Sequence, residues 1–365
     1  MEDTRNPGSS IKVGELFDRM PFTKTHLFVG FILFFVSVIE AWEAMLIIFI
    51  SSSIAGDFGL TPLQEGSLIG AIYLGEIPGT YIWALIADKL GRKKTLMYSL
   101  LIFAVVSLIT PFSIDFTMLY TVRFIAGLAL GGVMISGFPY FEELMPVKQR
   151  GKGIVYLSAG WPLGTLMAIG ATYVFTQGHV YGGWRGVIIL SSLAGLWAFM
   201  IRFLPESPYW LAAKGKQKEA KEAIRYLSQG QVEVKEQDEL VVEPFEKANY
   251  FSIFKKRFRK ITSLQTIVNF AFAFGYWGLY TWIPTLLSEK GLSLSQSLTF
   301  LTLSTLFQVP SYLVASKLTG KYGRKKIMVI FVALSVACGF GFAYAVNMPQ
   351  LYIFNFALSF FSLGA

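Results

Sequence analysis

Residues 91–94 read Gly-Arg-Lys-Lys, and residues 323–326 repeat the same four letters. Each copy is a short basic turn that follows one long apolar run and precedes another. A chain that repeats this arrangement so far apart is expected to consist of two similar halves. Two related helical halves in a membrane are the usual architecture of a transporter, with the substrate site between them.

The composition supports a membrane protein. Apolar residues make up 54% of the chain and charged residues 15%, and the mean hydropathy is +0.53. A run of about 20 apolar residues is long enough to cross a bilayer as a helix. We expect ten such spans, at 27–50, 63–87, 95–112, 116–139, 153–177, 184–204, 262–288, 293–317, 327–347 and 349–365. The last run reaches Ala365 without a polar tail, so we expect the chain to stop inside its tenth span, with part of the second half missing.

The basic residues predict the orientation. If the spans alternate, all but three of the 32 lysines and arginines lie on one side, which is then cytoplasmic; the exceptions are Arg123, Arg185 and Lys290. The net charge of +9 therefore follows from topology and not from nucleic-acid binding. We expect a multi-pass protein of the cell membrane with a cytoplasmic N-terminus.

The runs also divide the chain. We expect a cytoplasmic arm at 1–26, a six-helix bundle at 27–204, a cytoplasmic linker with short helices at 205–261, and a partial second bundle at 262–365. Small residues at close spacing, as in Gly75-x3-Gly79 and Gly127-x3-Gly131, allow helices to approach closely in lipid.

Enzymatic chemistry is not indicated. No His, Cys and carboxylate cluster has metal-ligand spacing, and the sequence lacks a nucleophile–base set and a cofactor loop. The single cysteine, Cys338, has no partner for an intrachain disulfide. We therefore expect no cofactor and no catalytic residue.

Charges within the apolar runs are the strongest functional signal, because a charge in a bilayer core is costly and usually faces an interior cavity. Glu40 and Glu43 share one face of the first span, and Arg123 lies at a compatible depth in the fourth. Burial and a second carboxylate favour the protonated acid, whereas a nearby arginine favours the ionised one. This balance suits a proton-coupling site; the alternative is a static buried salt bridge. Glu76, beside Pro78, is a weaker candidate.

Four motifs in chain order give a family resemblance over nearly the whole length. They are Asp88-Lys89-Leu90-Gly91-Arg92-Lys93, Arg123-x3-Gly127, Glu143-x2-Pro146-x3-Arg150-Gly151 and Pro205-Glu206-Ser207-Pro208-x-Trp210-Leu211. The chain resembles the major facilitator superfamily, whose fold is two pseudo-symmetric helical bundles. Glu40-Ala41-Trp42-Glu43, the arm at 17–22 and His26 are similar to the metabolite:proton symporters, which include aromatic-acid and nicotinate carriers, and the four motifs are shared with sugar porters.

The resemblance implies roles for the loop residues. Asp88, Arg92, Glu143, Arg150 and Glu206 would form a cytoplasmic charge network that controls rocking of the halves, with Gly91 in its turn. Gly323 and Arg324 stand at the second copy of the turn. Two departures affect this pattern: both first-span acids are Glu instead of Asp, and Gly320 replaces the expected loop aspartate of the second half.

Aromatic residues within the spans are candidates for a substrate pocket, since aromatics with a few polar groups suit a small planar metabolite. The candidates are Trp42, Trp161, Trp277, Tyr280 and Trp282, with Asn269 and Gln308 as polar contacts. The alternative is an aromatic belt at the membrane interface, above all for Trp282.

We therefore expect a monomeric secondary transporter that couples protons to the uptake of a small organic solute, carboxylated or aromatic. The alternatives are a sugar symporter or facilitator, a proton-driven multidrug exporter, and a nutrient sensor of transporter fold. The direction of coupled flux separates the exporter, and competition by carboxylates separates the sugar carrier.

Overall fold

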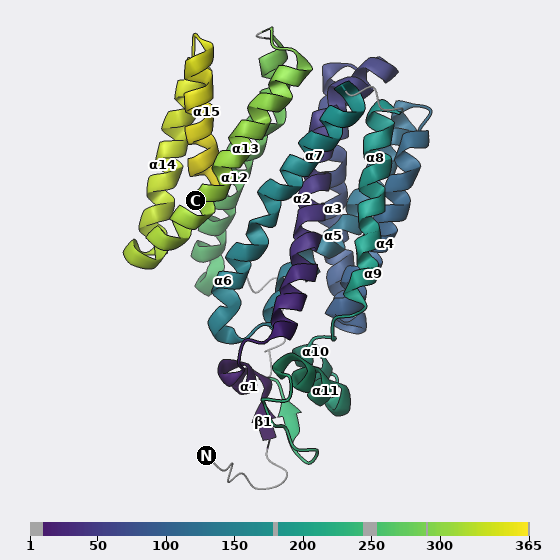
Figure 1. The fold of residues 1–365 in the computed structure, drawn as a ribbon, viewed down its shortest axis with the longest axis vertical. Helices are drawn as coiled ribbons and strands as arrows, with labels where there is room; N and C mark the ends of the chain where they lie inside the picture. Colours follow the sequence, from purple (N-terminus) through teal and green to yellow (C-terminus); the bar gives the residue numbers. More distant parts are fainter. Residues whose placement is uncertain (1–9, 178–181, 244–253, 290, 364–365) are drawn as a thin grey trace.

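The computed structural model describes residues 10–177, 182–243, 254–289 and 291–363, which are mostly helical (Figure 1). Among these residues, two short strands and the two 3-10 turns η1 and η2 interrupt the helices. The elements are β1 (Ser10–Lys12), α1 (Val13–Arg19), α2 (Lys24–Phe58), α3 (Pro62–Leu90), α4 (Arg92–Ile109), η1 (Thr110–Phe112), α5 (Phe116–Leu144), α6 (Val147–Ser158), α7 (Gly160–Gln177), α8 (Gly183–Ala194), η2 (Gly195–Trp197), α9 (Ala198–Ile201), α10 (Pro208–Ala213), α11 (Gln217–Ser228), β2 (Glu239–Val241), α12 (Lys256–Glu289), α13 (Leu294–Tyr322), α14 (Arg324–Ala343) and α15 (Met348–Leu363).

Within the described ranges, eight helical segments are long and apolar enough to cross a membrane, and they coincide with eight of the ten expected spans. The remaining two expected spans, 262–288 and 349–365, are helical as well and correspond to α12 and α15. Membrane crossing by these two is not confirmed. The expectation that the chain stops inside its tenth span stays a prediction.

Local capping explains where the long helices begin and end. Thr23 and His26 form a capping box at the start of α2, and Gly59, with a φ of 63°, ends that helix in the left-handed conformation. Thr61 and Gln64 form a second box that starts α3, with Pro62 in the first turn. These signals make α2 35 residues long, longer at both ends than the apolar run at 27–50.

The fifth and sixth expected spans are not single regular helices. The fifth is divided into α6 and α7 at Ala159, just before Pro162, which cannot donate a backbone hydrogen bond within a helix. The sixth passes from α8 through the 3-10 turn η2 into α9.

Two apolar clusters organise the bundle. One lies within the first half, where α2, α4 and α5 pack with the arm and the linker helices. The other joins the two halves and draws on the end of α2, the start of α3, the later part of α7, the end of α12 and the start of α13. Because the helices alternate in direction, these segments share the end of the bundle remote from α1, α10 and α11 (Figure 1).

The arm and linker form a small folded unit that the sequence did not predict in this detail. β1 pairs in parallel with β2, in the register Ser10 to Glu239 and Lys12 to Val241. The Nζ of Lys12 lies 2.7 Å from Oε1 of Glu243. The helix α11 is one of the short helices in the segment 205–261, where the sequence predicted them. The unit therefore ties the N-terminus to the linker.

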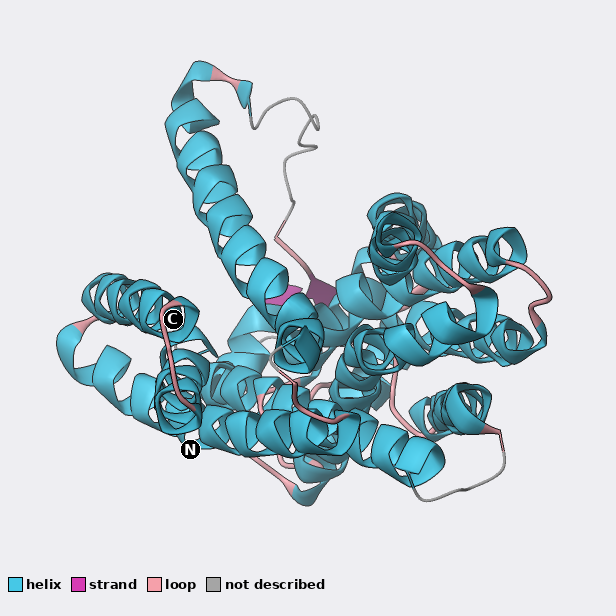
Figure 2. Ribbon diagram, turned by 90° about the horizontal axis from the view of Figure 1, so that it is seen from above, coloured by secondary structure: helices cyan, strands magenta, loops and turns pink. Residues whose placement is uncertain are grey.

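The helix α12 is unevenly packed. Nearly every residue from 256 to 275 is exposed, and burial begins at Tyr276. Figure 2 shows the first part of this helix, which follows the grey segment, projecting away from the other helices. The helix also begins at Lys256, before the expected boundary at 262. Only its second part contributes to the interface between the halves.

Candidate substrate and proton site

A buried ion pair lies in the middle of the first half. The Nη1 of Arg123, on α5, lies 3.5 Å from Oε2 of Glu43, on α2, and both side chains are 1% exposed. Two opposite charges at this depth attract strongly, but each also loses its hydration. The sequence placed both residues at compatible depth, and the structure places them together.

The pair leaves much of its hydrogen-bonding capacity unused. Both carboxylate oxygens of Glu43 and all three guanidinium nitrogens of Arg123 are buried without a hydrogen-bond partner among the described residues. Buried polar groups normally have partners, and charged ones most of all. The unused donors and acceptors of this site are available to bind a proton, a polar solute or water.

Two further carboxylates lie near the pair. Glu40 and Glu76 are half-buried, and Glu76 interacts electrostatically with both Glu40 and Arg123. Tyr73, on α3, donates a hydrogen bond of 2.8 Å to the carbonyl of Ala44, one residue beyond Glu43. Arg123 is the cation that the described residues place near these three acids, so the group has a net negative charge unless two of the carboxylates are protonated.

Aromatic side chains connect this polar group to the second half. The ring of Tyr73 lies 5.1 Å from that of Trp277, on α12, and Trp161, on α7, lies 5.8 Å from Trp277. Tyr276 and Tyr280 continue the series on α12, with 4.6 Å between their ring centroids. The indole nitrogens of Trp42 and Trp161 are buried, and the described residues offer neither a hydrogen-bond partner. These rings form a wall shared by both halves, and we call them the aromatic cluster: Trp42, Tyr73, Trp161, Tyr276, Trp277 and Tyr280.

Neutral polar side chains extend the cluster into the second half. The hydroxyl of Tyr280 donates to Ser359 of α15 at 2.7 Å. Gln308, on α13, and Asn355, on α15, are 2% and 0% exposed, and the side-chain oxygen of each lacks a hydrogen-bond partner in the part of the chain that the structure describes. Asn355 donates to Ser304. This side of the site offers amides and hydroxyls, and the residues just named carry no charge.

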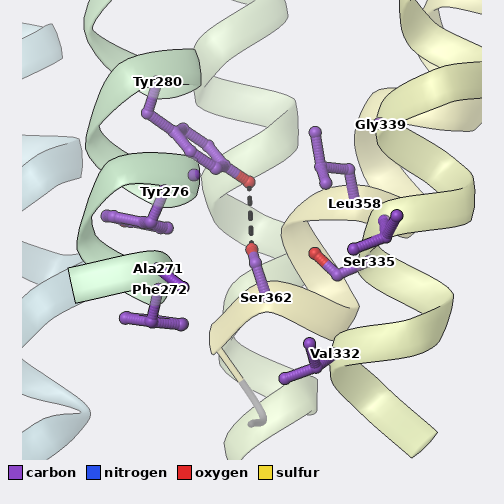
Figure 3. Close-up of a pocket in the computed structure, with 11 residues that line it drawn as sticks. Ala271, Phe272, Tyr276, Tyr280, Val332, Ser335, Gly339, Leu358 and Ser362 are labelled. Carbon is purple, nitrogen blue, oxygen red and sulfur yellow. Dashed lines mark hydrogen bonds between the residues drawn. The ribbon is translucent and has the colours of Figure 1, made fainter. Parts of the chain in front are cut away.

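A cavity of about 210 Å³ lies beside these groups, between α12, α14 and α15. Figure 3 shows Tyr280 reaching across it to Ser362, with Tyr276 below and Ser335 opposite. Most of its lining is apolar. The described lining includes Tyr280 but none of the other predicted pocket residues.

The structure does not bring every predicted pocket residue together. Asn269 is exposed on the first part of α12, where its side chain accepts a bond from Gln265 at 3.3 Å. Trp282 is 36% exposed and lies near Gly66 at the remote end of the bundle. Sequence reasoning did not select Tyr73, Tyr276 or Asn355 for the site. The sequence shows that these three residues lie in apolar runs. The direction in which their side chains point depends on how the helices pack.

The charge network predicted for the cytoplasmic side of the first half centres on Arg92. Its guanidinium lies 3.4 Å from Asp88 and 3.4 Å from Glu143. Asp88 is largely exposed, whereas Arg92 and Glu143 are partly buried, so the second pair is the better shielded from solvent. These three predicted residues therefore meet.

Glu206 reaches the same turn by a different route. Its Oε1 accepts the backbone N–H groups of Arg92, Lys93 and Ser207 at 2.9, 3.0 and 2.9 Å. A carboxylate at the start of α4 suits the positive end of that helix. Burial raises the pKa of Glu206, and these backbone bonds act in the opposite direction. Gly91, with a φ of 93°, is needed here because a Cβ would overlap this carboxylate.

Arg150 has aromatic partners. Its Nη2 donates to the hydroxyl of Tyr209 at 2.9 Å, and its guanidinium lies over the rings of Phe17 and Tyr209. It thus joins the arm to the linker, and its contacts among the described residues do not include the carboxylate partner expected for it. In the second half, Gly323 has a φ of 87° and precedes α14. The side chain of Arg324 lies outside the described part of the structure.

The fold and the site define a membrane transporter built from two helical halves around a buried polar and aromatic centre. Residues 28–365 match the Major Facilitator Superfamily, and the chain belongs to that family. Its members are transporters and not enzymes.

Known proteins agree with this assignment. The chain is 28% identical over 352 residues to the niacin transporter NiaP of Acinetobacter baylyi, covering 95% of the chain and 79% of that protein. It is 26% identical to the arabinose-proton symporter of Bacillus subtilis, covering 87% and 71%. A partially occluded inward-open structure of the xylose transporter XylE from E. coli has the same fold, with a TM-score of 0.70, 16% identity, and coverage of 93% and 85%.

Proposed function

We propose that the chain is a proton-coupled symporter of a small aromatic or carboxylated metabolite in the cell membrane, with its N-terminus in the cytoplasm. The observation that carries this proposal is the fully buried pair of Glu43 and Arg123, whose hydrogen-bonding capacity is unused beside the aromatic cluster. Niacin, the named substrate of one relative, is an aromatic carboxylate.

The chemistry follows from the pair. A proton that binds Glu43 neutralises its charge and releases Arg123 from its partner. The guanidinium then offers donors to a solute carboxylate, for which its planar fork is well shaped. Solute and proton would therefore bind together, while the aromatic rings hold the flat apolar part of the solute.

Alternating access supplies the movement. The halves meet at the end remote from the arm and linker, which corresponds to an inward-facing arrangement if the arm is cytoplasmic. When the remote end opens, the halves would close at the arm end, where the network around Arg92 would hold them together.

The test is uptake of labelled nicotinate, benzoate and glucose into proteoliposomes, with and without an inward proton gradient. We expect gradient-driven uptake of an acid, and a loss of roughly tenfold or more, equivalent to about 1.4 kcal/mol, in Glu43→Gln. Glu65→Gln is the matched control, because Glu65 on α3 accepts a hydrogen bond from Ser51 on α2, the helix of Glu43, away from the pair. The proposal would be contradicted if the rate of acid uptake were the same with and without the proton gradient and were unchanged in Glu43→Gln.

A sugar carrier is the second candidate. It is favoured by the amides and hydroxyls of the second half, since Gln308 and Asn355 hold buried acceptor oxygens suited to a polyol. Glucose uptake that benzoate does not inhibit would select it.

A further inference from the structure

A second cavity, of about 270 Å³, lies where the arm enters the first bundle, well apart from the site described above. It is bounded by the start of α2, the end of α5 and one side of α6, from Gln149 to Tyr156. Its described lining combines apolar residues with three polar ones, His26, Gln149 and Lys152, and no acidic residue is among them.

His26 presents a buried donor here. Its Nδ1 lies 3.0 Å from the backbone nitrogen of Thr23, and an N–H group can only donate, so Nδ1 accepts. The neutral ring assigned in this way carries its proton on Nε2. His26 is 0% exposed, and Nε2 has no hydrogen-bond partner among the described residues. A buried N–H without an acceptor is costly, so this wall of the cavity favours a ligand that accepts hydrogen bonds.

Lys152 and Gln149 supply further donors on α6, one turn apart, near the positive N-terminal end of that helix. An ammonium, an amide and an imidazole N–H around one cavity match a phosphate group. The absence of acidic lining residues excludes a cation as the natural occupant.

The apolar part of the cavity indicates where the phosphate comes from. Phe22 is 48% exposed and Leu27 61% exposed, and Tyr156 of α6 is 47% exposed. They stand where α2, a membrane-spanning helix, begins. Exposed apolar side chains beside a basic residue at this depth suit the boundary between acyl chains and headgroups.

We propose that this cavity binds the phosphate of an anionic phospholipid of the adjacent leaflet, with His26, Gln149 and Lys152 as donors and Leu27 and Tyr156 against the acyl chain. The bound lipid would rest against Phe22, and so against the arm, at the point where the chain enters the first helix.

The test is native mass spectrometry of the purified chain with added phosphatidylglycerol or phosphatidylcholine. We expect the chain to retain phosphatidylglycerol in preference to phosphatidylcholine. In Lys152→Glu the amount of retained phosphatidylglycerol should fall roughly fivefold or more, which is the effect of about one surface charge or more. The matched control is Lys148→Glu, which reverses an exposed lysine on the same helix outside the cavity and should retain the lipid.

A second variant tests the cavity itself. A Cβ at Gly30 would meet nothing nearer than Cε of Met145 at 3.8 Å, so Gly30→Leu is tolerated by the backbone and fills the space. We expect it to lose the lipid with an unchanged melting temperature. Any of three results would overturn a phospholipid site here. They are an equal loss of bound lipid in Lys148→Glu and Lys152→Glu, equal retention of phosphatidylglycerol and phosphatidylcholine, and displacement of the bound lipid by millimolar inorganic phosphate.

Discussion

At the scale of single residues, Arg123 and Glu43 carry most of the argument. A charge inside an apolar run is conspicuous in a sequence because burial penalises it. Depth along the helices made Glu43 and Glu40 both possible partners of Arg123. The structure selects Glu43, because the rotation of α2 turns that residue inward and leaves Glu40 half-buried near Glu76.

The pair also predicts a pattern of stability. Arg123→Ala leaves the carboxylate of Glu43 buried without its partner, which should destabilise the protein by about 3–5 kcal/mol. The double variant Arg123→Ala with Glu43→Gln removes that charge and should recover part of the loss. Thermal unfolding in detergent measures both.

The comparison has a clear opposite outcome. If the destabilisation of the double variant equals the sum of the effects of Arg123→Ala and Glu43→Gln measured singly, the two residues do not interact energetically. Their separation of 3.5 Å would then reflect proximity alone.

At the scale of elements, the glycines of α3 and α5 determine how closely those helices pack. A Cβ at Gly75 would overlap the carbonyl oxygen of Phe124, and one at Gly127 would overlap that of Ile72. The glycine spacing in the sequence predicted close approach in general. It did not predict that these two helices face each other, which places Arg123 of α5 beside Glu43.

We expect Gly127→Ala to destabilise the protein by about 1–3 kcal/mol, because two backbones must separate to admit the methyl group. Gly137→Ala on the same helix is the control, since a Cβ there has no neighbour within 4 Å. It should be neutral or stabilising by up to about 1 kcal/mol. The measurement is the denaturation midpoint of each variant, taken side by side. A similar decrease in both midpoints would show that α5 tolerates no side chain at either position.

At the scale of the whole molecule, the contacts between the halves extend to the end of the bundle remote from the arm, where Trp282 of α12 approaches Gly66 of α3. A Cβ at Gly66 would lie 3.6 Å from Cζ2 of that indole. If transport requires this end to open, a covalent link across it should stop transport.

The variant Gly66→Cys with Trp282→Cys, in a Cys338→Ser background, tests this requirement. A short dithiol-reactive reagent should reduce uptake to that of empty liposomes, and a reducing agent should restore it when the reagent contains a disulfide. Each single-cysteine variant, treated in the same way, controls for simple modification. Full uptake by the linked protein would contradict alternating access through this end.

The sequence by itself determined the number of apolar runs, the positions of the helices, the two basic turns and the identity of the buried charges. These properties follow from local causes: capping, hydropathy along one helix and the cost of a charge in lipid. The tertiary structure decided which acid meets Arg123, that Asn269 remains exposed, and that Arg150 contacts Phe17 and Tyr209. It also paired β1 with β2, more than 200 residues apart in sequence. Such contacts depend on how packed helices rotate and tilt against one another, and no periodicity within a single segment contains that information.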